Sequence, residues 1–284
     1  MVAAMTFSIA GSGGTAYGVA VASKFLGVGS VVPGVTAGIG AVATQSFAKV
    51  SYKADALALL AAGASAADAV ARITAADPLR ETRQVGVVGT HDAATFTGTE
   101  CMDWAGGRVG GDHLDGRYAV QGNILVGEQV VGEMERAWLD SSGQALARRL
   151  LAALVAGDRA GGDRRGRQGA ALYVVDVEGG YDDCGVLVDL RVDDHPDAVT
   201  ELARLLDLND LYFGGPEDVE PLHGALAAEV RERLARLGFT GAPDEAGLDI
   251  ALADWAGVEN YELRLSPGGI DARVLDALRA ATGY

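Results

Sequence analysis

The N-terminal part of the sequence alternates short runs of β-forming residues with glycine. Residues 6–10 and 17–24 are two such runs, and the Gly-rich segment 11–14 between them predicts a β-hairpin turn. The same glycines would suit a phosphate-binding loop only if a helix followed them, and here a second strand follows. The next 24 residues, 25–48, carry no charge and are long enough to raise the question of a membrane span. Because they include five glycines and Pro33 among β-branched residues, we predict short buried strands instead.

Helical spacing replaces this pattern after Ser51. Apolar residues recur at helical intervals as far as Gly63, and Ser65 with Asp68 three residues later has the form of a capping box that opens a second helix. Pro78 ends that helix. Further along the chain, the hydrophobic periodicity predicts strands at residues 84–90, 93–97, 118–126, 170–177 and 185–192. It predicts helices at about residues 128–139 and 144–155, and a Gly-rich connection precedes the strand at 118.

The order of these elements indicates the fold class. Runs of antiparallel strands interrupted by pairs of helices predict an α+β fold in which helical layers cover sheets, and not a doubly wound sheet. After Pro196 almost every segment has the period of an amphipathic helix. We therefore predict an α+β domain at residues 1–196, with residues 1–5 as a candidate leader, and a small all-helical domain at residues 197–284.

The charge balance excludes several classes of partner. The 284 residues include 39 Asp and Glu against 23 Lys and Arg, a formal net charge of −16. Because the chain as a whole would repel nucleic-acid phosphates and anionic membranes, we expect neither as a partner. Two cysteines are too few for a disulfide framework, and the N-terminus shows no export signal, so we expect a cytoplasmic protein.

A Gly-rich loop at residues 159–168 concentrates positive charge in this acidic chain. It holds four arginines, among them Arg164 and Arg165, and paired guanidinium groups suit carboxylate ligands. Asp163 in the same loop would orient an arginine or bind a substrate amine. The alternative is an ordinary solvated basic loop. We predict that the loop binds a small anionic substrate.

Polar residues within predicted strands give further candidates. Gln121 and Asn123 flank Gly122 in a strand-like run, where an amide side chain would donate to a developing oxyanion or, alternatively, cap a β-bulge. Gln45 stands at the end of a predicted buried strand and would line the same cleft or satisfy turn amides. Lys24 begins the uncharged stretch, so its ammonium either reaches solvent or serves a site.

Cys101 and two segments with Asp and His are weaker candidates. Cys101 has no evident partner histidine, so we predict a buried structural thiol and not a nucleophile. Residues 112–115 and 193–195 contain metal-ligand types, but in loop contexts where acidic residues are usually solvated. We therefore predict no metal site and no cofactor.

Seven runs in this order carry a resemblance to a known family: MTFSIA, GVAVASKFLGVGSVVPG, GAVATQS, CMDWAG, YAVQGNIL, AGGDRRGRQGAAL and VDLRVDDHPD. Over about residues 5–196 the chain resembles the domain of unknown function ten twenty-eight family, an uncharacterised relative of the N-terminal nucleophile (Ntn) hydrolases. The tail, with ALADWAGVENYE, resembles the peptidoglycan-binding-like domain that often follows it. The resemblance implies a four-layer αββα sandwich, in agreement with the predicted element order.

The resemblance also implies a chemistry. An Ntn hydrolase cuts amide bonds with the side chain of its first residue, while the α-amino group of that residue serves as the base. Thr6, directly after Met5, stands where such a nucleophile would stand, and Lys24 would tune it. Within an intact chain Thr6 has no free amine, and the alternative is an ordinary polar residue that starts a strand. Because Ntn relatives commonly assemble into oligomers, the resemblance implies a homo-oligomer.

Together these features predict an Ntn-type amidohydrolase that cuts a small, carboxylate-bearing amide. Thr6 would be nucleophile and base, residues 121–123 would lie near the oxyanion, and Asp163 and Arg164 would hold the substrate. Two alternatives stay open. One is a non-catalytic protein that binds an anionic ligand on the same fold, and the other is an enzyme that uses Glu100 or Asp163 as a general acid or base.

Overall fold

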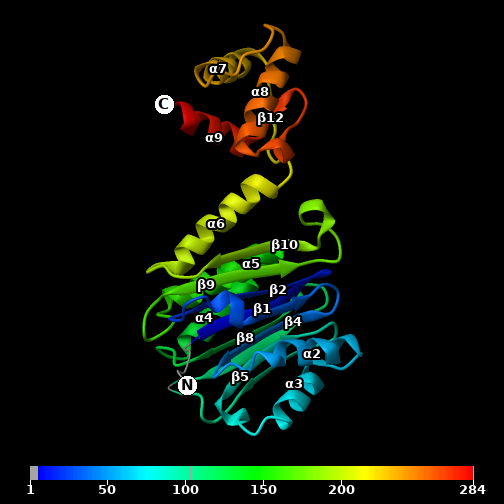
Figure 1. The fold of residues 1–284 in the computed structure, drawn as a ribbon, viewed down its shortest axis with the longest axis vertical. Helices are drawn as coiled ribbons and strands as arrows, with labels where there is room; N and C mark the ends of the chain where they lie inside the picture. Colours follow the sequence, from blue (N-terminus) through cyan, green and yellow to red (C-terminus); the bar gives the residue numbers. More distant parts are fainter. Residues whose placement is uncertain (1–5, 103, 284) are drawn as a thin grey trace. The chain divides into compact units, whose positions relative to one another are not determined.

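The computed structural model describes residues 6–102 and 104–283 (Figure 1). The candidate leader at residues 1–5 lies outside the described residues. The chain divides into two compact units, the first up to Leu205 and the second from Leu206 onward. The sequence-based boundary between residues 196 and 197 stays a prediction. The first unit mixes helices with antiparallel sheets, and the second is a mainly helical region.

Antiparallel strands form two sheets in the first unit. The larger sheet has six strands in the order β10-β9-β2-β1-β8-β7, and the smaller has four in the order β3-β4-β5-β6. β1 lies inside the larger sheet, where β2 and β8 pair with it on either side. The strands are β1 Thr6–Gly13, β2 Ala16–Ser23, β3 Pro33–Thr36, β4 Gly40–Ser46, β5 Arg83–Val88, β6 Ala93–Thr97, β7 Gly106–Asp112, β8 Gly116–Asn123, β9 Gly169–Val175 and β10 Val186–Val192.

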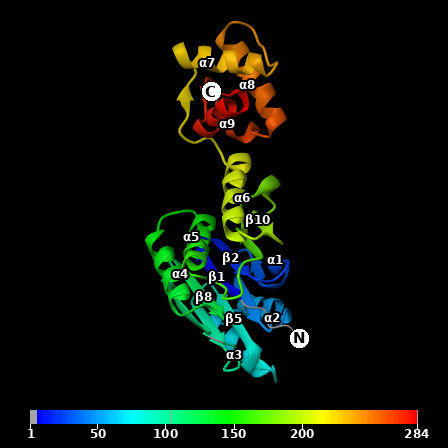
Figure 2. The same ribbon diagram turned by 90° about the vertical axis from the view of Figure 1, so that its left-hand side faces the viewer.

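Two pairs of helices cover the sheets. α2 (Ser51–Ala61) and α3 (Ala66–Ala75) pack against the smaller sheet, whereas α4 (Gln129–Asp140) and α5 (Leu146–Arg159) pack against the larger one (Figure 2). The single turn α1 (Val28–Val31) lies beside β9. The predicted capping box is confirmed, because the Ser65 hydroxyl accepts from Asp68 N at 3.0 Å at the start of α3. Short 3₁₀ turns lie at Arg80–Thr82 and Tyr181–Asp183.

Glycines on β1 and β2 allow the helix pair α4–α5 to approach the larger sheet closely. A Cβ atom at Gly11 would lie 2.7 Å from the ring of Trp138, and one at Gly18 would lie 2.7 Å from Leu150 Cδ1. Both distances are far below van der Waals contact, so a larger residue would push a helix away.

The predicted turn at residues 11–14 is wrong in its position. β1 continues to Gly13, and the turn falls at residues 14 and 15.

β7 is a strand of the first unit that the sequence did not predict. It occupies an edge of the larger sheet in the segment that we expected to be a Gly-rich connection. Four of its seven residues are glycine, so no alternation of side chains marks it as a strand. Pairing with β8 along its whole length supplies the strand geometry.

The two sheets face each other across a core that changes character along its length. At one end the facing side chains are apolar, with Val19, Val21, Ala43 and Val88 in one buried cluster. Because residues i and i+2 of a strand share a face, the same strands place other side chains on that face further along. At this other end the facing residues are polar, and each is at most 1% exposed: Thr6, Ser8, Gln45, Gln84, Gln121 and Asn123.

The second unit has a core of its own. Trp255, Leu252, Leu234 and Leu278 belong to one buried cluster. The prediction of a helical region is confirmed, but two very short strands, β11 (Glu220–Pro221) and β12 (Gly269–Ile270), pair within it. Its helices are the end of α6 (Ala198–Phe213), α7 (Gly224–Arg236), α8 (Glu245–Glu259) and α9 (Ala272–Thr282), with a 3₁₀ turn at Glu262–Arg264.

A buried ion pair lies in this second core. The side chains of Arg264 and Asp271 are 1% and 0% exposed, and Nη1 donates to Oδ2 at 2.9 Å. Arg264 Nε also donates to the Leu211 carbonyl oxygen, while Asp271 caps α9 by accepting from Arg273 N and Val274 N. These bonds compensate the loss of hydration that burial of two charges entails.

In the part of the chain that the structure describes, no helix has both the length and the apolar character needed to cross a membrane. Among residues 6–102 and 104–283, no group of three or more His, Cys, Asp or Glu side chains is arranged to hold a metal ion. The cytoplasmic location stays a prediction.

Candidate functional site

Thr6 opens β1 and lies in a row of polar residues across the larger sheet. In the ladder it stands opposite Ser23 of β2 and Asn123 of β8, so the three side chains lie on one face. The Thr6 hydroxyl donates to Ser23 Oγ at 3.2 Å, and both residues are buried. Because β1 is paired on both sides, the position of Thr6 is fixed more firmly than it would be on an edge strand.

Carboxamide side chains from both sheets hold the Thr6 carbonyl oxygen. Gln45 Nε2 donates to this oxygen at 3.2 Å and to Gln84 Oε1 at 2.8 Å. Asn123 Nδ2 donates to the same two acceptors at 3.5 and 3.0 Å. Gln84 in turn donates Nε2 to the Gly122 carbonyl oxygen at 2.8 Å. The bonds cross between the sheets and fix their spacing at this end.

Ser8 extends this network along β1. Its hydroxyl donates to Gln45 Oε1 at 2.6 Å and accepts from Gln121 Nε2 at 2.6 Å. The Gln121 carboxamide fills the space beside Gly86 of β5, where a Cβ atom would overlap Oε1 and lie 2.5 Å from Cδ. Residue 86 is therefore a glycine because the carboxamide occupies the position of a side chain.

Two oxygens of the network lack a hydrogen-bond donor within the described residues. They are Gln121 Oε1 and Asn123 Oδ1, on side chains that are 0% exposed. A buried acceptor without a donor costs about 1–3 kcal/mol, and native structures contain few of them. The amide N–H groups of the network are thus used within it, whereas these two acceptor oxygens are not. Such acceptors suit a ligand group that donates an N–H or O–H.

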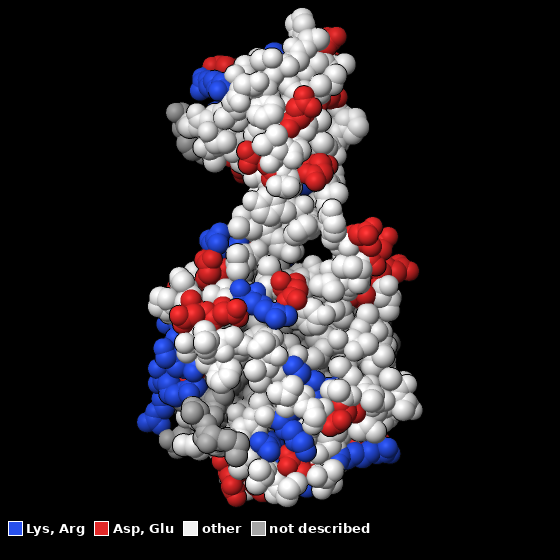
Figure 3. Space-filling model, viewed as in Figure 1, with Lys and Arg blue, Asp and Glu red and all other residues white. Residues whose placement is uncertain are grey.

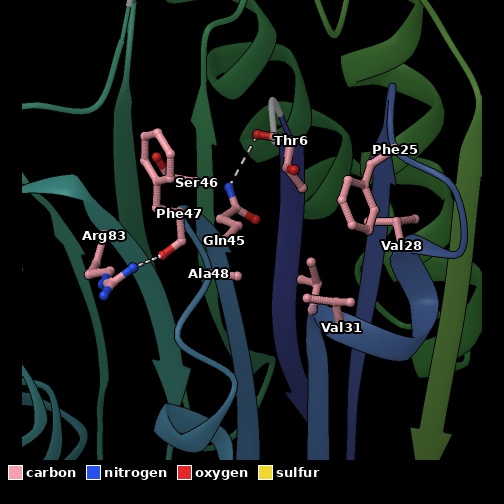
Figure 4. Close-up of a pocket in the computed structure, with 10 residues that line it drawn as sticks. Thr6, Phe25, Val28, Val31, Gln45, Ser46, Phe47, Ala48 and Arg83 are labelled. Carbon is pink, nitrogen blue, oxygen red and sulfur yellow. Dashed lines mark hydrogen bonds between the residues drawn. The ribbon is translucent and has the colours of Figure 1, made fainter. Parts of the chain in front are cut away.

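Thr6 also lines a pocket of about 230 Å³ (Figure 4). One wall is apolar and consists of Phe25 and three valines in and beside α1, namely Val28, Val31 and Val32. On the other side of Thr6 lie Gln45 and Arg83, together with residues 46–48, and Figure 4 shows the Gln45 amide nitrogen directed at the Thr6 carbonyl oxygen. Since pockets for drug-sized ligands measure roughly 300–1,000 Å³, this pocket suits a smaller organic group.

Arg83 brings a fixed positive charge to the pocket. Its Nε donates to Asp77 Oδ2 at 2.9 Å and its Nη1 to the Phe47 carbonyl oxygen at 2.5 Å. Burial alone would raise the pKa of Asp77, but hydrogen bonds from Leu79 N, Arg83 and Tyr52 and the charge of Arg83 lower this pKa to about 2. Burial and the hydrogen bond to Asp77 raise the pKa of Tyr52. The ionised Asp77 carboxylate therefore holds the Arg83 guanidinium in place.

Ser46 and Cys101 lie beside this arginine. Ser46 ends β4 with a φ of 67°, in the left-handed region that is unfavourable for serine and recurs at functional sites. Cys101 Sγ donates to the Arg83 carbonyl oxygen at 3.3 Å. Burial raises the pKa of the Cys101 thiol, and this effect outweighs hydrogen bonds with Ser46 and Gly98 that lower the pKa. Such surroundings are those of a structural thiol and not of a nucleophile.

Comparisons with known proteins identify the family. Residues 6–202 match the model of a family described as "Family of unknown function (DUF1028)". This chain belongs to the DUF1028 family. Residues 212–278 match a second model, described as "Putative peptidoglycan binding domain". The chain is also similar to the crystal structure of a DUF1028 protein from Silicibacter pomeroyi, with 29% identity, a TM-score of 0.64 and coverage of 79% of this chain and 93% of that chain. No curated protein matches the chain.

The Arg-rich loop of this DUF1028 protein is tied to its own acidic residues. Asp163 is buried and accepts from Lys24 N at 2.7 Å and from Arg165 N at 2.9 Å. Arg165 Nη2 pairs with Asp163 at 3.2 Å, and Arg167 Nε pairs with Asp158 at 2.6 Å. None of these residues lines the Thr6 pocket. Asp163 therefore holds the loop against the end of β2, and the ion pairs offset part of the positive charge that we expected a substrate to meet.

The same loop nevertheless approaches the row of Thr6 from the other face of the sheet. A smaller cavity of about 80 Å³ is lined by Ser23, Asp163, Arg167 and others. Ser23 accepts the Thr6 hydroxyl, so it stands between this cavity and the larger pocket. The loop and Thr6 are neighbours through Ser23, but they do not share one pocket.

Lys24, Arg164 and Glu100 do not line the Thr6 pocket either. Lys24 is exposed and its Nζ donates to the Arg167 carbonyl oxygen at 3.3 Å, so the expectation that it reaches solvent describes it better than a role beside a nucleophile. Arg164 N donates to the Ile124 carbonyl oxygen at 3.4 Å. Glu100 is exposed. Functional roles for these residues and for Arg165 stay predictions.

The structure brings together Thr6, Gln45, Gln121 and Asn123 and adds residues that the sequence did not single out. Gln84 is the clearest omission. It shares one face of its strand with Gly86 and Val88, and an uncharged polar residue at the start of such a buried face indicates that the core is polar at that end. Arg83 gave no such signal, since a charged residue at the first position of a strand is usually solvated. Its place in the pocket follows from the pairing of β4 with β5.

Proposed function

We propose that this DUF1028 protein is an amide hydrolase of the Ntn type with Thr6 as its nucleophile. The observation that carries the proposal is the convergence of buried carboxamides on Thr6 where this residue lines a pocket. The arrangement of two facing sheets with a pair of helices against each supports it, because a four-layer αββα sandwich is the architecture that we expect for this class. We further propose that residues before Thr6 are removed in the active protein.

In the proposed reaction the α-amino group of Thr6 is free. Its ordinary pKa of about 7.7–8.0 lies close to neutral pH, so the neutral amine can take the proton of Thr6 Oγ1 as this oxygen attacks the substrate carbonyl carbon. The C–N bond then breaks, the leaving amine receives the proton, and the acyl group remains on Oγ1 as an ester. Water attacks the ester, the carboxylic acid leaves, and Oγ1 regains its proton.

The hydrogen bonds change the roles that the sequence suggested for Gln121 and Asn123. Both N–H groups of Asn123 are used, one on the Thr6 carbonyl oxygen and one on Gln84 Oε1. Asn123 is therefore a positioning residue for Thr6 and not a donor to an oxyanion. Gln121 acts one step further away, because its Nε2 holds Ser8, which in turn donates to Gln45.

The pocket lining supports a substrate with a small apolar acyl group that carries a carboxylate. Phe25 and Val31 offer apolar contacts to the acyl chain, and Arg83 lies on the other side of Thr6. A guanidinium fixed by a carboxylate on one edge presents its other edge to a second carboxylate. We therefore assign recognition of the anionic group to Arg83 and not to the loop at residues 159–168.

Intact-mass measurement of the purified native protein tests the nucleophile. We expect the mass of a chain that begins at Thr6, because only that chain has the free amine. If every molecule keeps residues before Thr6, the free-amine mechanism is excluded regardless of any activity found.

An activity screen with amides of small carboxylic acids tests the chemistry. Thr6→Ala should lower turnover by at least about 10³-fold, since it removes the nucleophile, whereas Thr6→Ser should keep part of the activity. Thr15→Ala removes the same atoms from the exposed β1–β2 turn and should leave turnover unchanged. The mass of each variant is measured as well, so that a processing defect is separated from a chemical one. Saturable binding of a small carboxylate without turnover of any amide would support the non-catalytic alternative.

A further inference from the structure

A groove on the helix pair α4–α5 differs in charge from the rest of this acidic protein. Its volume is about 840 Å³, and α4 and α5 lie side by side along it (Figure 2). The floor is made mainly of apolar side chains, among them Ala137 of α4 and Leu151 and Val155 of α5. Its charged lining residues are Glu133, Arg136, Arg148 and Arg159. Three positive charges against one negative give the groove a net charge of +2, in a chain of net charge −16.

Helix α8 in the second unit presents a face of complementary character. Its inner side packs Leu248, Leu252 and Trp255 into the core. On its outer side Ile250 and Val258 are 59% and 66% exposed, and the small residues between them are exposed as well. A helix that is apolar on both sides is typical of a helix that is buried on both sides. Within the described residues nothing covers the outer side.

Two acidic residues belong to this outer face of α8. At about 100° per residue from Ile250, Asp254 lies about 40° round the helix, between Ile250 and Val258, and Asp249 lies about 100° round on the opposite side, at the edge of the face. The second unit, from Leu206 onward, holds 15 Asp and Glu against 6 Arg, a net charge of −9. On the molecular face drawn in Figure 3, Lys and Arg side chains are accordingly more numerous over the first unit than over the second.

We propose that α8 of one copy docks in the α4–α5 groove of a second copy. Ile250 and Val258 are eight positions apart, about 12 Å along a helix, and Arg148 and Arg159 span about 16 Å of α5, so the apolar face fits between these arginines. Asp249, at the edge of this face, would then meet the basic rim. Two grooves facing each other would instead bring like charges together, which disfavours a groove-to-groove dimer.

Each copy offers one groove and one α8, and in the proposed assembly two copies exchange both contacts, which makes it a closed dimer and not an open chain. A single helix in a groove buries less than the roughly 800 Å² per partner of a standard stable interface. The affinity of each contact is therefore modest, and the dimer depends on both. We expect a reversible dimer with a Kd on the order of micromolar, weakened by salt because the rims are charged.

Sedimentation equilibrium of the full chain, with three variants, tests the proposal. Ile250→Asp places a charge in the α8 face, and Arg136→Glu with Arg159→Glu reverses the exposed rim of the groove. Each should weaken dimerisation at least tenfold. Arg72→Glu makes the same charge change as one of these two substitutions, on the exposed side of α3, and should leave the Kd unchanged. If Ile250→Asp lowers the melting temperature, Val258→Asp, at a position 66% exposed, takes its place.

Mixing the two defective variants gives the decisive result. The Ile250→Asp chain keeps an intact groove and the Arg136→Glu/Arg159→Glu chain keeps an intact α8, so the mixture restores one of the two contacts. It should associate more strongly than either variant alone and more weakly than the native chain. A native chain that stays monomeric at several hundred micromolar would overturn the proposal. A dimer whose Kd is unaffected by the variants, or a mixture that associates no more strongly than either variant alone, would overturn it equally.

Discussion

Replacing Gly86 by alanine is the most direct test of the carboxamide network between the sheets. The new Cβ atom would overlap Gln121 Oε1 and lie 2.5 Å from Cδ and 2.8 Å from Nε2. The Gln121 side chain would have to move, although it is 0% exposed and donates to Ser8 Oγ at 2.6 Å. We therefore expect the variant to lose both the packing and the hydrogen bond at this point.

The size of the effect follows from these two contributions. Overpacking of a well-filled core costs about 1–3 kcal/mol, and loss of the Gln121–Ser8 hydrogen bond adds roughly 0.5–1.5 kcal/mol. The first unit should therefore be destabilised by about 1.5–4.5 kcal/mol. For a domain of this size each kcal/mol lowers the melting temperature by roughly 2–4 °C, so the shift is easily measured by calorimetry.

A double-mutant cycle shows whether Gln121 is the neighbour that matters. In a Gln121→Ala background the added methyl group has room, so Gly86→Ala should cost at least about 1 kcal/mol less than it does in the native protein. Gly132→Ala in the interior of α4 is the matched control. A Cβ atom there would meet only Arg108, at 3.8 Å or more. This control should be neutral or stabilise the protein by a few tenths to about 1 kcal/mol.

Equal stability of the Gly86→Ala variant and the native protein would refute the proposed packing of Gln121. A cost that is the same with and without Gln121 would refute it as well, because the clash would then involve other atoms.

Three further predictions concern the arginine pocket, the second core and the pocket wall. The pKa of Asp77 is lowered to about 2, so its contribution to stability is full above its ordinary pKa of 3.8 and is lost as the pH falls toward 2. In chemical denaturation, Asp77→Asn should be less stable than the native protein near neutral pH, and the two should converge near pH 2; a constant difference would contradict the assignment. Arg264→Met leaves the Asp271 charge buried without its partner and should cost the second unit about 3–5 kcal/mol, seen as faster hydrogen exchange in α9, whereas Arg264→Met with Asp271→Asn should recover much of this loss. Val31→Trp should fill the pocket beside Thr6 and abolish turnover without lowering the melting temperature, while Leu26→Trp, at a position 63% exposed, serves as its control and should have no effect.

Features that depend only on contacts between residues close in the sequence could be predicted from the sequence. The cap of α3 needs only Ser65 and the amide three residues later, so it could be predicted from the sequence. Runs of β-forming residues bounded by glycine likewise predicted β1, β2 and β4. In β7 the pairing with β8 outweighs a composition of mostly glycine, and no local pattern reports that pairing.

The candidate site could be predicted only in part because its chemistry depends on contacts between distant segments. The loop at residues 159–168 was expected to be a cationic site, since the sequence shows four arginines close together. In three dimensions Asp158 and Asp163 pair with Arg167 and Arg165. Arg83 instead enters the pocket because the pairing of β5 with β4 places it near the end of β4.

The core between the sheets joins an apolar end and an amide end that respond differently to temperature. Hydrophobic stabilisation weakens on cooling, and exposure of apolar surface raises the heat capacity, whereas exposure of polar surface lowers it. A local opening confined to Gln45, Gln84 and their neighbours should therefore have a much smaller heat-capacity change than unfolding of the whole unit. As the protein is cooled, the hydrogen bonds around Thr6 should keep their strength, whereas the apolar end of the same core should lose part of its hydrophobic stabilisation. The end of the core at the candidate site should therefore be more resistant to cold than the apolar end.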